Sequence, residues 1–240
     1  MERLLEQHVS RANGATLDVE RMTQEVLRRL AQRLEETNGR LYEIEVPIGI
    51  SVRHCHLCQA DVETLFGEGH SLSVFNELYQ KGYFAAAEQL MVVGKRRCIE
   101  KVRVLGPTRS ISQVELSQTD ALMLGLKLPL AVNGTDPAVA PITLVGPEGV
   151  VTLPGKGQGG AFVMRRHVHL NLEVAGRLGV KEGDMLDLRV TGPRDATLHG
   201  VVVRIKEGWR PEVHLDTDEG NAVAIRSGQS GILIVPEALR

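Results

Sequence analysis

Aromatic residues are scarce in this chain, with one Trp, three Tyr and four Phe among 240 residues. A core must therefore be filled mainly by aliphatic side chains, which is typical of many short strands joined by tight turns. Long apolar runs are also missing, since none approaches the ~20 residues that a membrane-spanning helix needs. The N-terminus lacks the charged-then-apolar layout of a secretory signal. We therefore expect a soluble, cytoplasmic protein without a membrane partner.

The chain has no large excess of positive or negative charge, and it contains few cysteines. The formal net charge is -2 with 24% charged residues, so no basic or acidic excess indicates binding to nucleic acid or an anionic membrane surface. Three cysteines, an odd number in a chain too long to need disulfides, favour a reducing compartment. The glycine-rich motifs of dinucleotide and P-loop sites are absent. A nucleotide-cofactor oxidoreductase or an ATPase is therefore unsupported.

Histidine, in contrast, is concentrated in a repeated pentapeptide, R-H-x-H-L. It occurs at Arg53 to Leu57 and again, 113 positions later, at Arg166 to Leu170, so the two copies hold four of the eight histidines. Residues i and i+2 of a strand project from one face, so each copy presents two imidazoles with a spacing that suits chelation of a metal. A single H-x-H is a weak signal, but the second copy within similar flanks indicates an internal duplication.

A second pair of similar segments follows the two histidine pairs. Residues 113–120 (QVELSQTD) resemble residues 212–219 (EVHLDTDE), which places Glu115 opposite His214 between a Val and a Leu in both segments. Taken alone, Glu115 is better explained as a solvent-facing strand residue and His214 as a hydrogen-bonded core histidine. At equivalent points of a duplication they become candidate metal ligands, which gives the set His54, His56, Glu115, His167, His169 and His214.

The rest of the chain predicts strands, turns and short helices. Alternating apolar residues over 43–52 predict a strand that runs into the first histidine pair, and a short helix ended by glycine follows each pentapeptide. Short apolar runs separated by Gly-Pro, Asn-Gly and Pro-Gly turns fill the remainder. This pattern favours a mainly β protein built from small barrels or sandwiches over a doubly wound α/β sheet.

The N-terminal segment differs in character from the remainder. Between Leu17 and Glu36, apolar residues recur at the spacing of one helical stripe: Val19, Met22, Val26, Leu27, Leu30 and Leu34. Such an amphipathic helix can pack on the domain that follows it, or it can dock on a partner protein. The pattern alone leaves both possibilities open.

Arg109 is a candidate for binding an anionic substrate. It follows a Gly-Pro turn and lies six residues before Glu115, on the same turn-and-strand unit. Arginine is well suited to bidentate binding of oxyanions such as phosphate, although a surface role is the commoner explanation for a single arginine. Cys55 and Cys58 lack the second cysteine pair or the thioredoxin-like context of a zinc or redox motif, so we interpret both as packing residues.

Several segments stand out together with the two histidine pairs: PIGISxRHxHL at 47–57, FAAxE at 84–88, VRVLGPxR at 102–109, QVE at 113–115, RHVHL at 166–170 and HLDTDE at 214–219. Through them the chain, from about Glu43 to Asn221, resembles the phosphate propanoyltransferase (phosphotransacylase) family of the propanediol-utilisation type. This resemblance implies a transfer of a short acyl group between coenzyme A and inorganic phosphate. It also implies two small β-barrels related by the internal duplication and capped by short helices.

From the resemblance we expect three parts in the chain. Residues 1–40 are an N-terminal extension, residues 41–52 together with 165–240 form one β-barrel, and residues 53–164 form the other. The family further implies two zinc ions, with one held by His54 and His56 and open to the coenzyme A sulfur. The second would be held by Glu115, His167, His169 and His214, and Arg109 would bind phosphate.

Three local departures from the family pattern bear on substrate contacts. Val52 replaces a polar residue before the first arginine, Ala87 stands where a more polar residue is common, and Lys81-Gly82-Tyr83 replaces a Pro-Gly-Gln turn. These changes affect the expected contacts to coenzyme A or the acyl chain, whereas all six ligands and Arg109 are retained.

The resemblance also suggests where the protein resides and what it binds. Relatives with an N-terminal extension are commonly cargo of bacterial microcompartments, so residues 17–36 are expected to act as an encapsulation helix that binds shell proteins. The expected location is then the microcompartment lumen. The expected substrates are acyl-CoA and phosphate, and we expect a homo-oligomer.

Two other function classes compete with the acyltransferase. A cupin-type metal oxygenase also uses H-x-H, Glu and His on a barrel, but its Glu follows the pair within a few residues, whereas Glu115 lies 59 positions after His56. The other alternative is an inactive relative that organises cargo, in which an intact set of ligands would be unexpected.

Overall fold

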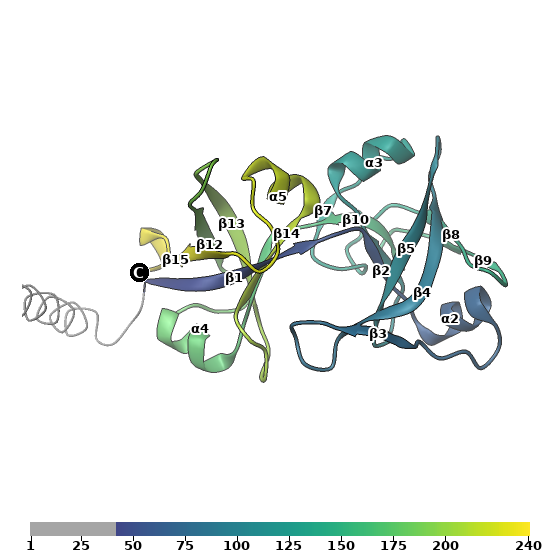
Figure 1. Cartoon of the computed structure of the whole chain (residues 1–240), viewed down its shortest axis with the longest axis horizontal. Helices are drawn as coiled ribbons and strands as arrows, with labels where there is room; N and C mark the ends of the chain where they lie inside the picture. The colour runs from purple at the N-terminus through teal and green to yellow at the C-terminus, as the bar shows by residue number, and fades with distance from the viewer. Residues whose placement is uncertain (1–41) are drawn as a thin grey trace, which may run out of the picture.

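Two β-sheets lie side by side in the computed structural model, which describes residues 42–240 (Figure 1). Within these residues, one sheet is a closed six-stranded barrel with the order β1-β14-β11-β13-β12-β15. Its strands are β1 (Glu43–Ser51), β11 (His167–Leu170), β12 (Met185–Val190), β13 (Ala196–Ile205), β14 (Glu212–Asp216) and β15 (Ser230–Ile234). The expected extension, residues 1–40 with the helical stripe at 17–36, lies outside the described residues.

The second sheet of the described chain has nine strands, in the order β7-β10-β6-β2-β5-β4-β8-β9, with β3 paired to β4. These strands are β2 (His54–His56), β3 (Val74–Glu77), β4 (Phe84–Val93), β5 (Cys98–Gly106), β6 (Gln113–Glu115), β7 (Leu130–Ala131), β8 (Ile142–Val145), β9 (Val150–Leu153) and β10 (Gly160–Met164). The mainly β prediction is confirmed for the described residues, but this second sheet is open.

The duplication is visible in the strand pairing. β2 pairs antiparallel with β6 and parallel with β5, while β11 pairs antiparallel with β14 and parallel with β13. The strand leading into each pentapeptide is exchanged between the sheets: β1 precedes β2 but pairs with β14, and β10 precedes β11 but pairs with β6. Six strands of the open sheet therefore repeat the barrel plan, in the order β10-β6-β2-β5-β4-β8.

The expectation of a second closed barrel is wrong because its last ladder is reduced to one bridge. In the barrel, β15 closes the sheet by five residue pairs with β1. In the second sheet the corresponding contact within residues 42–240 is the isolated bridge between Ala140 and Ala161, before β8 begins. Ala140 and Ala161 exchange both of their backbone hydrogen bonds, but no further residue pair of the described chain continues this ladder, so the sheet stays open.

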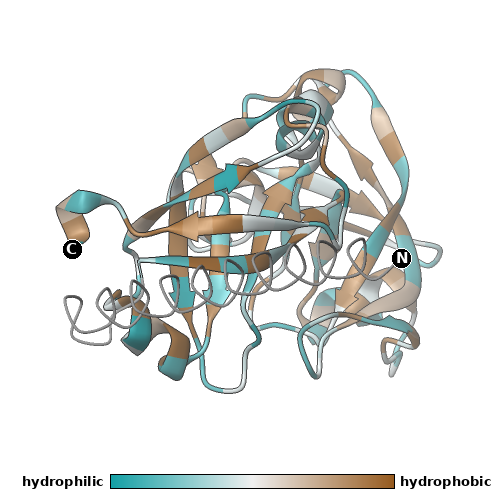
Figure 2. Ribbon diagram, turned by 60° about the vertical axis from the view of Figure 1, so that its left-hand side comes forward, coloured by the Kyte–Doolittle hydropathy of each residue, from teal (hydrophilic) through white to brown (hydrophobic). Residues whose placement is uncertain are grey.

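Each sheet encloses its own apolar core of aliphatic side chains. The barrel core includes Ile48, Val168, Leu188 and Leu233, and the core of the second sheet includes Leu57, Leu65, Val104 and Leu144. Buried and more exposed residues alternate along most of β4 and through the middle of β13. Figure 2 shows strands on which apolar residues are interrupted by polar ones. This is the arrangement expected of strands with one buried face.

Short helices cover the ends of the sheets in equivalent places. α2 (Gln59–Phe66) and α4 (Leu172–Leu178) follow the two histidine strands, while α3 (Gln118–Leu124) and α5 (Thr217–Ala222) follow β6 and β14. A short 3₁₀ helix, η1 (Glu237–Leu239), ends the chain. Both α3 and α5 begin with a capping box, in which the N-cap side chain and the acid three residues later satisfy each other's backbone amides. No helix within residues 42–240 has both the length and the apolar character required to cross a bilayer.

Candidate active site

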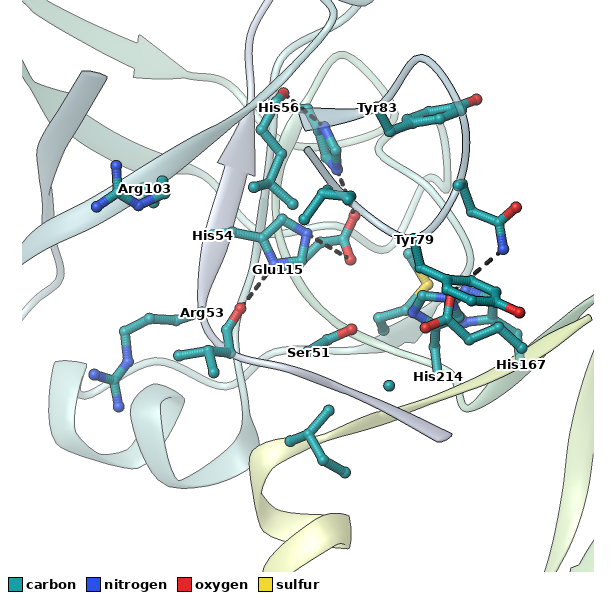
Figure 3. Close-up of a pocket in the computed structure, with 18 of the residues that line it drawn as sticks. Ser51, Arg53, His54, His56, Tyr79, Tyr83, Arg103, Glu115, His167 and His214 are labelled. Atoms are coloured by element: carbon teal, nitrogen blue, oxygen red, sulfur yellow. Dashed lines mark hydrogen bonds and ion pairs between the residues drawn. The ribbon is translucent and has the colours of Figure 1, made fainter. Parts of the chain in front are cut away.

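A cavity of about 720 Å³ lies where the two sheets meet. All six candidate ligands and Arg109 line it, and they come from β2, β6, β11 and β14 and from the loop after β5. Figure 3 shows His54, His56 and Glu115 pointing toward one another, with His167 and His214 across the pocket. The exchange of β1 and β10 between the sheets keeps both histidine strands beside this shared cavity.

The first cluster consists of His54, His56 and Glu115, all buried. The Nε2 atom of His54 lies 3.3 Å from Glu115 Oε2, and that of His56 lies 3.6 Å from Oε1. The opposite ring nitrogens contact backbone carbonyls, with Nδ1 of His54 2.8 Å from the oxygen of Val52 and Nδ1 of His56 3.1 Å from that of Leu105. These contacts leave both Nε2 atoms directed at the carboxylate, an arrangement suited to metal ligation.

The protonation of the first cluster follows from burial and from Glu115. Burial disfavours the Glu115 anion, but the neighbouring histidines outweigh it and hold the pKa of this carboxyl far below its usual value. Burial lowers the pKa of His56 to about 3 despite the attraction of Glu115. Burial also tends to lower the pKa of His54, but the attraction of the Glu115 carboxylate is stronger, so the pKa of His54 is raised. The cluster therefore offers an ionised carboxylate and a neutral imidazole on His56.

The second cluster consists of His167, His169 and His214. Their ring centroids are 4.5 to 4.9 Å apart, and the rings of His167 and His214 are nearly parallel. Burial lowers the pKa of His167 to about 3 and that of His169 to about 2, and repulsion from His214 adds to both shifts. Neutral imidazoles are the form of histidine that binds metal ions.

Both clusters fit a metal ion by their donor chemistry. In each, the three ligand atoms lie within 4.8 Å of one another. In the second cluster the buried Nδ1 of His169 makes no hydrogen bond among the described residues. Buried polar atoms without partners are costly, so the close packing of His167, His169 and His214 is best explained as a ligand set. Histidine and carboxylate ligands in threes are typical of zinc sites with an open position.

The grouping of Glu115 differs from the expectation stated above. We expected it to join His167, His169 and His214, but its carboxylate groups with His54 and His56. The cause is strand register, because β6 pairs antiparallel with β2 and sets Glu115 directly opposite His54. In the barrel the same register sets His214 opposite His167. Each cluster therefore holds three residues, two from the pentapeptide and one from the neighbouring strand.

Basic side chains surround the clusters in the same cavity, namely Arg53, Lys101, Arg103, Arg109 and Arg204. Arg53 is engaged by Asp120, and Arg103 stacks on Phe75 with its carbon Cζ 4.4 Å from the ring centroid. Burial lowers the pKa of Arg109, against the attraction of Glu115. Arg109 forms no ion pair of 4.0 Å or less with a carboxylate in residues 42–240. Its cation remains available to an anionic ligand.

Several cavity residues were not anticipated from the sequence. The Trp209 ring lies over His169 with a centroid distance of 4.0 Å, and Tyr79 and Tyr83 come from the loop between β3 and β4. Gln80 of that loop is buried and its amide donates to the oxygen of Arg210, 2.8 Å away, in the barrel. In the sequence, only the departure from the family pattern at Lys81-Gly82-Tyr83 indicated that this loop contributes to the site.

Cys55 occupies the face of β2 opposite to the ligands. Its side chain is fully buried in the core of the second sheet, and burial raises the pKa of the thiol. A thiol held protonated is a poor metal ligand or nucleophile. The packing role predicted for Cys55 therefore agrees with its position.

Comparison with known proteins places the chain in a family. Residues 47–226 match the family model for phosphate propanoyltransferase. A phosphate propanoyltransferase from Lachnoclostridium phytofermentans is 41% identical over 88% of this chain and 95% of its own length. One from Planctopirus limnophila is 40% identical over 93% of both chains, and one from Salmonella typhimurium is 40% identical over 74% of this chain and 82% of its own. The protein is an acyltransferase and belongs to the phosphate propanoyltransferase family.

Proposed function

We propose that this enzyme moves a short acyl group between coenzyme A and inorganic phosphate, with a zinc ion at each cluster. The observation that carries the proposal is the presence of two three-residue clusters and an uncommitted arginine in one cavity. Family membership supports the acyl transfer, because the relatives are named phosphate propanoyltransferases. His54, His56 and Glu115 would hold one zinc, and His167, His169 and His214 the other.

The charges lining the cavity suit two anionic substrates. Arg109 is the proposed phosphate ligand, because a guanidinium binds phosphate oxygens in a bidentate manner. Arg103 and Lys101 line the same cavity and favour the phosphates of coenzyme A. Among the neighbouring charges, Glu115 has the largest effect on Arg109. Its carboxylate contacts His54 and His56, so it does not cancel the positive charge of the cavity wall.

The proposed reaction has phosphate attack the thioester carbonyl, after which the carbon–sulfur bond breaks and coenzyme A leaves as a thiolate. Zinc, when bound, supplies Lewis acidity that stabilises a thiolate and polarises a carbonyl. Arg109 orients phosphate and offsets its charge as it nears a second anion, which is the main obstacle to bringing these substrates together. The Trp209 ring covers one side of His169 and limits access of water to the second cluster.

The same proposal covers the organisation of the whole chain. Residues 41–52 with 165–240 and residues 53–164 are proposed as the two domains, with the active site between them and a homo-oligomer as the working form. Residues 1–40, through the helical stripe at 17–36, are proposed to bind shell proteins of a bacterial microcompartment and to place the enzyme in its lumen. The amphipathic spacing of Val19, Met22 and Val26 supports this part of the proposal.

The decisive experiment measures metal content and coenzyme A release in parallel. The purified chain should contain two zinc ions, and release of coenzyme A from an acyl thioester should require phosphate. His54→Ala and His169→Ala should each lose one zinc and at least ~1,000-fold in turnover, as expected for removal of an essential catalytic group. Phosphate-dependent turnover that persists in zinc-free protein would overturn the proposal.

A further inference from the structure

Gln113 and Glu212 occupy the same place in the two halves of the molecule. Each lies two residues before the third ligand of its cluster, on β6 or β14. In the strand pairing, Gln113 lies opposite His56, and Glu212 lies opposite His169. Both side chains are buried in the described structure. The duplication therefore places a buried polar side chain beside each cluster, but with different chemistry.

Gln113 is fixed from both ends of its amide group. Its Nε2 donates to Glu115 Oε1 at 2.8 Å, and its Oε1 accepts from the backbone N–H of Gly134 at 3.0 Å. The Gly134 contact determines which end of the amide faces the cluster, because an N–H can bond only to the oxygen. The two hydrogens of the amide are therefore directed at the carboxylate side.

Glu212 stands in the corresponding relation to His214. Its Oε2 lies 3.1 Å from His214 Nε2 and accepts from the amide of Gln80 at 3.3 Å. Gly49 makes room for this carboxylate, since a Cβ at that position would lie 2.8 Å from Oε1. His214 Nε2 makes no hydrogen bond with the described residues in this conformation. A small rotation of the ring would convert the 3.1 Å contact into one.

We propose that Gln113 and Glu212 are positioning residues, each supplying the group that its neighbouring metal ligand requires. This inference rests on the two metal sites of the proposed function. An amide donor orients the Glu115 carboxylate, whereas a carboxylate acceptor would orient the His214 imidazole through Nε2–H, with Nδ1 as the proposed metal ligand. A partner on the outer face of a ligand fixes its orientation, and for an imidazole a carboxylate also raises its basicity. Where the third ligand is a carboxylate, its positioning residue is an amide donor, and where the third ligand is an imidazole, its positioning residue is a carboxylate acceptor.

The test uses full-length chains that keep one cluster each. His54→Ala with His56→Ala retains the second cluster, and His167→Ala with His169→Ala retains the first. Gln113→Met and Glu212→Gln are introduced separately into both backgrounds, and zinc affinity is measured by competition with a chromophoric chelator. Gln113→Met should weaken zinc binding about 10- to 100-fold in the chain that keeps the first cluster, and less than twofold in the other. Glu212→Gln should show the reverse pattern.

Two further variants guard against a failure to fold. Gln113→Asn shortens the side chain so that it cannot reach both Gly134 and Glu115, and Gly49→Ala pushes the Glu212 carboxylate aside without changing it. Each should reproduce the cluster-specific loss. Equal losses at both clusters, or unchanged affinity at the matched cluster, would overturn the inference while wild-type protein still binds two zinc ions. Absence of zinc binding by the wild type would overturn the proposed function as well.

Discussion

Arg53 and Arg166 open the two pentapeptides, and both reach a carboxylate at the start of a helix. Arg53 contacts Asp120 of α3 through two nitrogens, at 2.8 and 2.9 Å, and Arg166 contacts Glu219 of α5 at 2.7 Å. Both acids occupy the N3 position of a capping box, three residues after the N-cap. The arginine of R-H-x-H-L therefore ties each histidine strand to the helix that follows the third ligand. This explains why it belongs to the repeat although it is not a ligand.

Replacement of Arg53 should destabilise the fold more than replacement of Arg166. Arg53→Ala leaves the Asp120 side chain, which is 2% exposed, without its ionic partner, whereas Glu219 is 19% exposed. Because an unpaired buried charge is costly and Arg53 itself is partly solvated, we expect a loss of about 2 kcal/mol for Arg53→Ala and under ~1 kcal/mol for Arg166→Ala. Thermal unfolding at neutral pH measures both, and equal effects would contradict the expectation.

Arg109 should govern the use of phosphate. Arg109→Ala is expected to lower kcat/KM for phosphate about 10- to 100-fold, since a charge-assisted hydrogen bond contributes ~1.5–3 kcal/mol. Arg109→Lys keeps the charge but not the planar guanidinium, so its kcat/KM for phosphate should lie between those of the wild type and Arg109→Ala. Zinc content should remain at two ions per chain in both variants. A KM for phosphate that matches the wild type in Arg109→Ala would remove this residue from the site.

At the level of elements, the short strands β2 and β11 were predicted well because their signal is local. Period-two histidines and a following glycine-ended helix are readable within fifteen residues. The strands that pair with them are harder to predict, because β6 has only three residues and is separated from β2 by more than fifty residues of sequence. The register between them, rather than composition, decides which cluster receives Glu115. The carboxylate of Glu115 lies beside His54 and His56, whereas the family resemblance assigns it to the metal held by His167, His169 and His214.

Glu88 on β4 binds His70 and Ser73 in the segment that precedes β3. Its carboxylate accepts hydrogen bonds from the Ser73 hydroxyl at 2.6 Å and from the Ser73 backbone N–H, and it contacts His70 Nε2 at 2.9 Å. Burial would raise its pKa, but the bonds from Ser73 and His70 outweigh burial and lower it. The folded protein thus favours the ionised form. The FAAxE motif therefore has a structural explanation at its last position.

The contribution of Glu88 should depend on pH. Because its pKa is lower in the folded state, the stabilisation is complete above the unfolded value of about 4.3 and is lost as pH falls through the folded value. Glu88→Gln should therefore cost about 2 kcal/mol at pH 7, and the gap to the wild type should narrow below pH ~4. Urea unfolding at pH 7 and pH 3.5 measures the gap. A gap that is constant with pH would contradict the ionic role.

On the scale of the molecule, the two sheets meet at one cavity that both clusters share. Neither sheet contains a complete site, because Arg109 and the first cluster belong to one and the second cluster to the other. The loop with Gln80 spans the junction and bonds to both Arg210 and Glu212 of the barrel. The proposed acyl transfer therefore depends on the relative placement of the two sheets.

Removal of residues 1–40 should separate encapsulation from catalysis. We expect the truncated chain to keep its kcat/KM within about twofold, because the cavity residues found among residues 42–240 all lie beyond position 48. It should no longer co-purify with microcompartment shells, whereas the full chain should. Replacing Val19, Met22 and Val26 by Ser in the full chain is the matched control for the apolar stripe. Loss of folding on truncation would instead favour packing of this segment on the enzyme.

The sequence by itself determined the mainly β class, the two chelating histidine pairs and the six candidate ligands, because period-two patterns and a fifteen-residue repeat are local properties of a chain. It also carried the family resemblance that the comparisons confirm. Tertiary structure alone decided the cluster to which Glu115 belongs, the failure of the second sheet to close and the support of Glu115 and His214 by Gln113 and Glu212. These features depend on strand register and on loops meeting across two sheets, which are contacts between residues far apart in the chain.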